Sequence, residues 1–258
     1  MDGALPQQLI SLDLFSVVAV IATGLVAGFF NVTAGGGSTL TLPLLMVLLG
    51  LPGPVANGSN RVAIIVQNLV AVPTFRQGGV RGIRRILPLV ALALPGTLIG
   101  AWLGVTISDQ LFRRILAFVM IGLAGTVFAT SRKTPTDESE NRTFTTPTLM
   151  SFLFIGFYAG FIQAGVGFFI IFALSGLQHL PLVRVHAYKV AIVLLLQLAA
   201  LPVFLLGGAV NATVGLLLAV GLAGGGFIGA RITLKGDEKL LRILLALGAL
   251  ALAFKLLI

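Results

Sequence analysis

Two basic residues lie inside otherwise apolar segments of this chain, Arg61 and Lys189. All eight acidic residues lie in the termini, in loops or at the ends of segments, so no apolar segment offers either cation a carboxylate. A charge inside a bilayer costs free energy unless it is paired, and such residues are functional by default. We infer that the partner is a bound anion. In the alternative interpretation both side chains snorkel to the interface, because each lies about two helical turns, or roughly 9–11 Å, into its segment.

Polar side chains near both cations could donate hydrogen bonds to the oxygen atoms of an anion. Asn60 directly precedes Arg61, and Tyr188 directly precedes Lys189. We therefore expect Asn60 and Tyr188 to bind substrate together with the two cations. His186 could titrate and couple protons to transport. The other polar neighbours of the two cations are Asn57, Ser59, Gln67, Asn68 and Gln197.

A glycine-rich break separates a long apolar segment from a short one at two places, within residues 27–38 and within residues 159–167. Glycine-broken short segments at matching places in two halves point to the substrate site of a transporter. A broken helix leaves free backbone N–H groups, which favour an anion together with the helix dipole. The alternative is a plain helix–loop connection. The residues that we expect to bind substrate here are Asn31, Gly35, Gly36, Gly37, Ser38, Gln163, Gly165 and Gly167.

Composition identifies an integral membrane protein. The chain has 258 residues, of which 57% are hydrophobic and 10% charged, and it offers many stretches of the roughly 20 apolar residues that span a bilayer. The alternation typical of a transmembrane β-barrel is missing, so we predict an all-α, polytopic transmembrane bundle with the lipid bilayer as a partner. The net charge of +9 sets topology through basic loops and does not indicate nucleic acid. The chain contains no cysteine, and we expect no metal and no cofactor.

Hydropathy divides the chain into ten apolar segments and one long polar stretch. The polar stretch, residues 131–147, is expected to link a first transmembrane repeat at 12–130 to a second at 148–258. Whether the short segments cross the membrane or re-enter it stays open. The ten segments are 12–34, 38–50, 55–75, 84–106, 110–130, 147–164, 168–178, 182–206, 210–230 and 239–257.

Four matches in the same order indicate that the halves arose by duplication. The glycine ladders at Gly96, Gly100 and Gly104 and at Gly221, Gly225 and Gly229 are expected to pack against neighbouring backbones. The matching pairs are Gly24–Phe29 with Gly156–Phe161, Arg61–Ile64 with Lys189–Ile192, Gly96–Ala101 with Gly225–Ala230, and Asp109 with Arg114–Leu116 against Asp237 with Arg242–Leu244.

The distribution of basic residues predicts the orientation of the two halves. The loop after the third segment carries Arg76, Arg81, Arg84 and Arg85, whereas its counterpart Gly207–Asn211 is uncharged. The reverse holds for the loop after the ninth segment, which carries Arg231, Lys235, Lys239 and Arg242. Equivalent loops that exchange charge predict an inverted repeat, with a cytoplasmic linker and both termini outside. Arg113 and Arg114, in the first half, are the opposing observation.

The motifs around the first break resemble a known family. The run from Ala27-Gly28-Phe29 through Gly35-Gly36-Gly37 and Leu42-Pro43-Leu44-Leu45 to Gly50-Leu51-Pro52 and Val55–Ser59 resembles the first repeat of the sulfite exporter TauE/SafE family of membrane permeases. Gly156–Gly167 with His186–Lys189 resembles the second repeat, with Val166 in place of the usual glycine. The resemblance implies a multi-pass transporter of the bacterial inner membrane for a small sulfur-containing anion, such as sulfite or an organosulfonate.

From these observations we expect an exporter that works by alternating access and is not an enzyme, because the hydrolase, zinc-protease and P-loop motifs are missing. The alternatives are an anion channel or a proton-coupled permease for another small anionic solute. A homodimer is left open.

Overall fold

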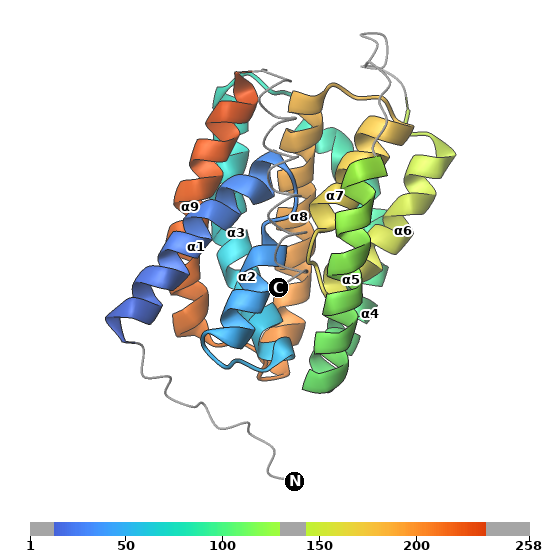
Figure 1. Cartoon of the computed structure of the whole chain (residues 1–258). Helices are drawn as coiled ribbons and strands as arrows, with labels where there is room; N and C mark the ends of the chain where they lie inside the picture. Colours follow the sequence, from blue (N-terminus) through green and yellow to red (C-terminus); the bar gives the residue numbers. More distant parts are fainter. Residues whose placement is uncertain (1–12, 130–142, 236–258) are drawn as a thin grey trace.

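A computed structural model describes residues 13–129 and 143–235 of the chain. Every regular element in these two ranges is helical and neither contains a β-strand, which confirms the predicted all-α fold (Figure 1). Nine of the ten predicted segments correspond to helices or helix pairs, whereas the tenth and most of the linker lie outside the described residues. The elements are α1 (Leu14–Thr33), α2 (Ser38–Val47), α3 (Gly53–Gln77), η1 (Ile83–Ile86), α4 (Leu87–Thr106), α5 (Asp109–Ala129), α6 (Thr146–Phe161), α7 (Val166–Ile171), the π-helical η3 (Phe172–Leu177), α8 (Leu182–Leu206) and α9 (Ala212–Leu234).

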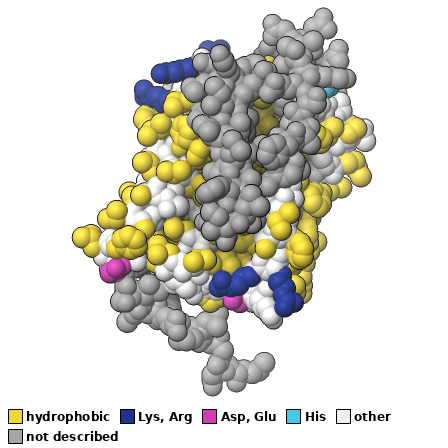
Figure 2. Space-filling model, in the orientation of Figure 1, with side chains coloured by type: hydrophobic (Ala, Val, Ile, Leu, Met, Phe, Trp, Pro, Cys, Tyr) yellow, Lys and Arg dark blue, Asp and Glu magenta, His cyan; other side chains and the backbone are white. Residues whose placement is uncertain are grey.

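The surface of the bundle is that of a multi-pass membrane protein. In the described ranges α1, η1 with α4, α8 and α9 are each long and apolar enough to span a bilayer. Figure 2 shows hydrophobic side chains along both sides of the described surface, and exposed apolar surface of this extent is typical of proteins that contact lipid. Exposed members of this surface include Phe15, Trp102, Phe118, Phe154 and Leu206.

Helix α3 is as long as the spanning helices, but its side chains are polar where theirs are apolar. Pro52 and Pro54 fix the start of α3, and it ends before Gly78. Its buried positions include asparagine, glutamine and arginine. Helix α3 therefore brings polar side chains into the interior of an otherwise apolar bundle. Helix α8 is its counterpart, since it follows Pro181 and ends before Gly207.

Two short elements do not cross the membrane by themselves. The 10 residues of α2 extend roughly 15 Å, about half of the hydrocarbon thickness. Gly37 lies against Ala27 and Asn31 of α1, so the chain turns back at the break and α2 leads down to the loop before α3 (Figure 1). Helix α7 with η3 is the short counterpart in the second half. The described residues therefore favour re-entrant short segments.

The halves interlock through their glycine ladders. Helix α1 packs along α9, and α6 packs along α4. A Cβ atom on Gly225 would lie 1.9 Å from the carbonyl oxygen of Leu25, and one on Gly100 would lie 2.1 Å from that of Phe157. The backbones approach so closely that only glycine fits. This confirms the predicted packing role of the ladders and shows that the first helix of each half lies against the other half.

One end of the bundle collects most of the described basic side chains. Gly78 at the end of α3 is covered by Leu234 at the end of α9, and Arg85 lies 5.9 Å from the ring of Phe144, before α6. Arg113 and Arg114 lie at the start of α5, beside the start of α3. The positive-inside rule predicts that the strongly basic end faces the cytoplasm. The side chains at that end are Arg76, Arg81, Arg84, Arg85, Arg184, Arg231 and Lys235.

Candidate functional site

The two glycine breaks lie against each other in the interior of the bundle. Gly35 and Gly165 have left-handed backbone conformations, with φ angles of 91° and 72°. A Cβ atom on Gly35 would lie 2.6 Å from the carbonyl carbon of Gly167, and one on Gly167 would lie 2.3 Å from the Cα atom of Gly35. Both distances are far below van der Waals contact, so equivalent glycines of the two halves touch backbone to backbone.

The other glycines of the first break also lie in close packing. A Cβ atom on Gly36 would meet the ring of Phe168, and one on Gly37 would meet the carbonyl oxygen of Ala27. The backbone N–H groups of Gly36, Gly37 and Ser38, at the start of α2, have no hydrogen-bond acceptor among the described residues. They are the unsatisfied donors that a helix start provides.

Arg61 of α3 is fully buried and binds the end of α6. Its Nη1 atom donates to the carbonyl oxygen of Ala159 at 3.0 Å and to Oε1 of Gln197 at 2.5 Å, and its Nη2 atom donates to the carbonyl oxygen of Gly160. The guanidinium also lies 4.2 Å above the ring of Phe204. Carbonyl groups in the last turn of a helix carry partial negative charge, so this cation caps α6.

Lys189 of α8 is 2% exposed and binds the end of α1. Its Nζ atom donates to the carbonyl oxygens of Asn31 at 2.8 Å and Val32 at 2.6 Å. Nδ1 of His186 lies 3.3 Å from the same Nζ atom, and as acceptor from the ammonium it would carry its own proton on Nε2.

The two cations therefore have reciprocal roles. Arg61 of the first half caps a helix of the second half, and Lys189 of the second half caps a helix of the first. Neither side chain reaches the membrane surface, so the snorkelling alternative is wrong. The sequence shows no carboxylate near either cation, but it does not reveal the helix carbonyls that bind both of them. In this structure the carbonyls supply at least part of the balance.

Polar side chains of α3 face all the segments around the breaks. Asn31 donates from Nδ2 to Oε1 of Gln67 at 3.1 Å, which joins α1 to α3. Asn60 accepts at Oδ1 from the hydroxyl of Thr41 at 2.8 Å, which joins α3 to α2. Gln163, with a left-handed φ of 57°, donates to the carbonyl oxygen of Asn57 at 3.3 Å. We call this group of side chains the amide chamber; its members are Asn31, Asn57, Asn60, Arg61, Gln67, Asn68, Gln163 and Gln197.

Seven buried polar atoms of the amide chamber have no hydrogen-bond partner among residues 13–129 and 143–235. They comprise five N–H donors and two carbonyl oxygens. A buried polar group without a partner costs free energy, and in native proteins it marks a place for water or a ligand. Because unpaired N–H donors outnumber unpaired oxygen atoms, the site suits a ligand that presents oxygen acceptors. The atoms are Asn60 Nδ2, Arg61 Nε, Gln67 Nε2, Asn68 Nδ2, Gln197 Nε2, Asn57 Oδ1 and Gln163 Oε1.

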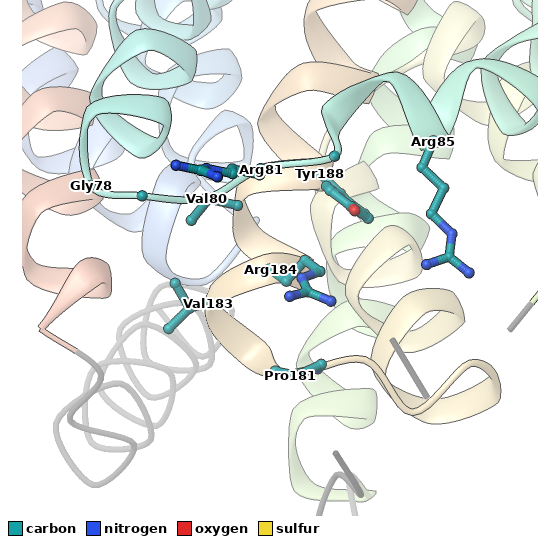
Figure 3. A pocket seen from close by; sticks show the side chains of 10 residues that line it. Gly78, Val80, Arg81, Arg85, Pro181, Val183, Arg184 and Tyr188 are labelled. Carbon is teal, nitrogen blue, oxygen red and sulfur yellow. The ribbon is translucent and has the colours of Figure 1, made fainter. Parts of the chain in front are cut away.

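Tyr188 lies apart from the other predicted site residues. It lines a pocket at the basic end, together with the loop before η1 and the start of α8 (Figure 3). Successive residues of a helix point about 100° apart, which explains why Lys189 faces α1 while its neighbour Tyr188 faces this pocket. Because Tyr188 faces this pocket and not the breaks, its position does not support the predicted role in the substrate site.

Sequence reasoning missed several partners of the cations and amides. Phe204 and Thr41 lie far from Arg61 and Asn60 along the chain and have no unusual sequence context. The backbone carbonyls of Ala159 and Asn31 carry no sequence pattern, because every residue has one. Gln197 was recognised only as a polar neighbour, although it bonds directly to Arg61.

Known proteins resemble the chain over most of its length. The model of the family "Sulfite exporter TauE/SafE" matches residues 20–256. The "Probable membrane transporter protein ORF9" of Sinorhizobium sp is 28% identical over 90% of this chain and 88% of its own. A "Probable membrane transporter protein" of Haemophilus influenzae is 25% identical over 96% of each chain, and YfcA of Escherichia coli K12 is 27% identical over 90% of this chain and 86% of its own. No solved structure matches significantly.

The family match spans both glycine breaks, both buried cations and the polar helix between them. It agrees with the resemblance found in the motifs of the first break and with the apolar outer surface. The chain belongs to the TauE/SafE sulfite exporter family and is a multi-pass membrane transporter.

Proposed function

We propose that this protein transports a small sulfur oxyanion, sulfite or an organosulfonate, across the bacterial inner membrane, and that the amide chamber is its substrate site. The observation that carries the proposal is the set of five buried N–H donors without partners. Sulfite and sulfonates present several oxygen acceptors on one compact group, so they match such a surface. The family's description as sulfite exporters supports the same substrate class and an outward direction of transport.

The two buried cations give this site its charge selectivity. Their carbonyl partners balance part of the charge, so the site is weakly positive without a fully unpaired ion. A weak field permits release as well as capture, which a carrier requires. Neutral amides then supply most of the direct contacts, with the free N–H groups of Gly36, Gly37 and Ser38 beside them.

The interlocked halves suit alternating access. In Figure 1 the chain rises along α1 and descends along the equivalent α6, which supports the predicted inverted repeat. The two repeats meet at Gly35 and Gly167, so the site lies where the halves move against each other. A saturable flux with slow turnover distinguishes this carrier from the alternative, an anion channel.

Proton coupling through His186 is a second candidate role. Its contact with Lys189 favours this role, since a proton on either group changes the charge beside the end of α1. In a vesicle assay, His186→Gln is expected to keep substrate flux but to lose its response to an imposed pH gradient. A variant that responds like the wild type would remove His186 from the mechanism.

A ligand screen with a matched pair of variants tests the proposed substrate site. Ligand that binds the folded state raises apparent stability, by about 2.7 kcal/mol at a hundred times Kd. Sulfite or a sulfonate should stabilise the purified wild type, and Asn68→Leu should abolish this gain while leaving the protein folded, since it removes an unpaired buried amide.

Thr74→Val is the control for this screen, because Thr74 lies on the same helix and its hydroxyl bonds only within that helix, to the carbonyl oxygen of Val70. It should keep the full ligand response. Equal stabilisation of Asn68→Leu and the wild type would refute the chamber as the site.

A further inference from the structure

A pocket lies at the basic end of the bundle, apart from the amide chamber. It has a volume of about 500 Å³ and is formed by the loop between α3 and η1 together with the first turns of α8. Gly79 and Gly82 shape the loop through left-handed φ angles of 90° and 80°. This volume is within the range of small-molecule sites, so it accommodates an organic anion as well as an inorganic one.

Three arginines line this pocket, and no carboxylate lines it within residues 13–129 and 143–235. Arg81 lies on the loop, Arg85 on η1 and Arg184 on α8, so two separate segments of the chain bring them together. Figure 3 shows Tyr188 between Arg85 and Arg184. Each guanidinium has five N–H donors in a fork that matches oxyanion geometry, so it can serve a ligand alongside other partners.

The pocket also adjoins the proposed path of the substrate. Tyr188 is buried beneath it, and a Cβ atom on Gly82 would lie 3.1 Å from the tyrosine hydroxyl. The next residue along α8 is Lys189, which caps α1 at the first break. The pocket and the buried cation are therefore served by consecutive residues of α8, one facing the basic end and the other facing the end of α1.

We propose that this pocket is a second oxyanion site, which holds a sulfite or sulfonate group at the cytoplasmic mouth before it passes Tyr188 toward the chamber. Arg85 and Arg184 donate hydrogen bonds to the oxyanion, and Arg81, at the rim of the pocket, attracts it through its positive charge. The role in transport rests on the proposed function, whereas binding in the pocket does not.

Calorimetric titration of the purified full-length protein with sulfite tests the second site. The wild type should bind two equivalents per chain. Arg85→Gln and Arg184→Gln should each weaken one equivalent about tenfold or more, because each loses a charge-assisted hydrogen-bond donor. Arg84→Gln is the matched control, since Arg84 is exposed on the same turn and does not line the pocket; it should bind as the wild type does.

The variants separate this proposal from the proposed function. Asn68→Leu should lose the chamber equivalent and keep the pocket equivalent. Two unaltered equivalents in Arg85→Gln and Arg184→Gln would overturn the second site even if Asn68→Leu behaves as expected. If Arg184→Gln fails to fold, Arg184→Lys keeps the charge but loses the fork, and it should still weaken the pocket equivalent.

A lipid headgroup carries the same oxyanion chemistry, so its contribution must be measured separately. The titration is repeated in nanodiscs of phosphatidylcholine and in nanodiscs that also contain phosphatidylglycerol. A free substrate anion should bind the pocket in both. Loss of the pocket equivalent only with phosphatidylglycerol would assign the pocket to lipid and overturn its role as a substrate mouth.

Discussion

At the scale of single residues, the two buried cations both cap the carboxyl end of a helix from the other half, but their charged groups differ in shape. The fork of Arg61 reaches two carbonyls and an amide at once, and a guanidinium stays charged under all cellular conditions. The ammonium of Lys189 is a compact charge that reaches two carbonyls and an imidazole. One half of the protein is therefore capped by a planar fork with several donors, and the other half is capped by a compact ammonium.

Loss of the Lys189 cap should destabilise the protein. Lys189→Met leaves the carbonyl oxygens of Asn31 and Val32 without donors. Hydrogen bonds to a charged group contribute roughly 1.5–3 kcal/mol each, and relief of the buried charge offsets part of this, so we expect a net loss of about 2–4 kcal/mol in unfolding free energy. Thermal or denaturant unfolding in detergent measures it.

Lys235→Met is the control for Lys189→Met, because it removes a lysine that is exposed at the end of α9. This substitution should change the free energy of unfolding by no more than about 0.5 kcal/mol. Equal effects of the two substitutions would contradict the capping role of Lys189.

Asp109 should make stability fall at acid pH. Partial burial raises the pKa of this carboxyl, but hydrogen bonds from Arg113 and from the Gly53 amide outweigh it, so the pKa lies below its ordinary value of 3.8. A lowered folded-state pKa means that the contribution is complete above the unfolded-state value and is lost as pH falls through the folded-state value.

The melting temperature should therefore drop more steeply in the wild type than in Asp109→Asn as pH falls from about 5 towards 3. Parallel pH profiles of the two proteins would show that Asp109 does not stabilise the contact between α5 and α3.

At the scale of elements, most helix bounds could be predicted and the environment of each helix could not. Long apolar runs predict the extent of the helices. Prolines such as Pro52 and Pro181 predict where helices begin, because proline fixes the backbone at a helix start. Sequence alone could not show that α3 is central, since its polar side chains are equally compatible with a surface helix. Nor could it show that Tyr188 lines the pocket at the basic end while Lys189 contacts the end of α1, because that depends on which neighbours surround α8.

The contact between the breaks should tolerate no added methyl group. Gly35→Ala strains a left-handed backbone, and both Gly35→Ala and Gly167→Ala place a Cβ atom below 3 Å from backbone atoms of the other break. We expect each to lower the melting temperature and to reduce transport sharply.

Gly122→Ala is the control for the two breaks. No atom lies within 4 Å of the added Cβ and the position is helical, so it should be neutral or stabilise by roughly 0.5–1 kcal/mol. Normal transport by Gly167→Ala would contradict the close approach of the two breaks.

At the scale of the whole molecule, the reciprocal caps and reciprocal helix packing make the halves mutually dependent. Duplication could be predicted from matched motifs such as Gly24–Phe29 and Gly156–Phe161. The interlocking of α1 with α9 and of α6 with α4 could not, because a repeated pattern is equally compatible with two separate bundles. Most of the predicted linker and the whole tenth segment lie outside the described residues, so the division into 12–130 and 148–258 stays a prediction.

The orientation of the bundle can be measured with single cysteines, since the natural chain has none. Gln77→Cys places a thiol at the strongly basic end, and Gln110→Cys places one at the opposite end; both positions are exposed. A membrane-impermeant thiol reagent added to intact cells should label Gln110→Cys and leave Gln77→Cys unlabelled until the membrane is opened. The reverse pattern would contradict the positive-inside assignment.

The most direct test of the central claim is sulfite flux in proteoliposomes. The claim is that unpaired buried amides of α3 receive a sulfur oxyanion, so the wild type and the control Thr74→Val should carry a saturable flux and Asn68→Leu should lose it at normal folding and incorporation. A full flux through Asn68→Leu, or no flux of sulfite or any sulfonate through the wild type, would contradict the account.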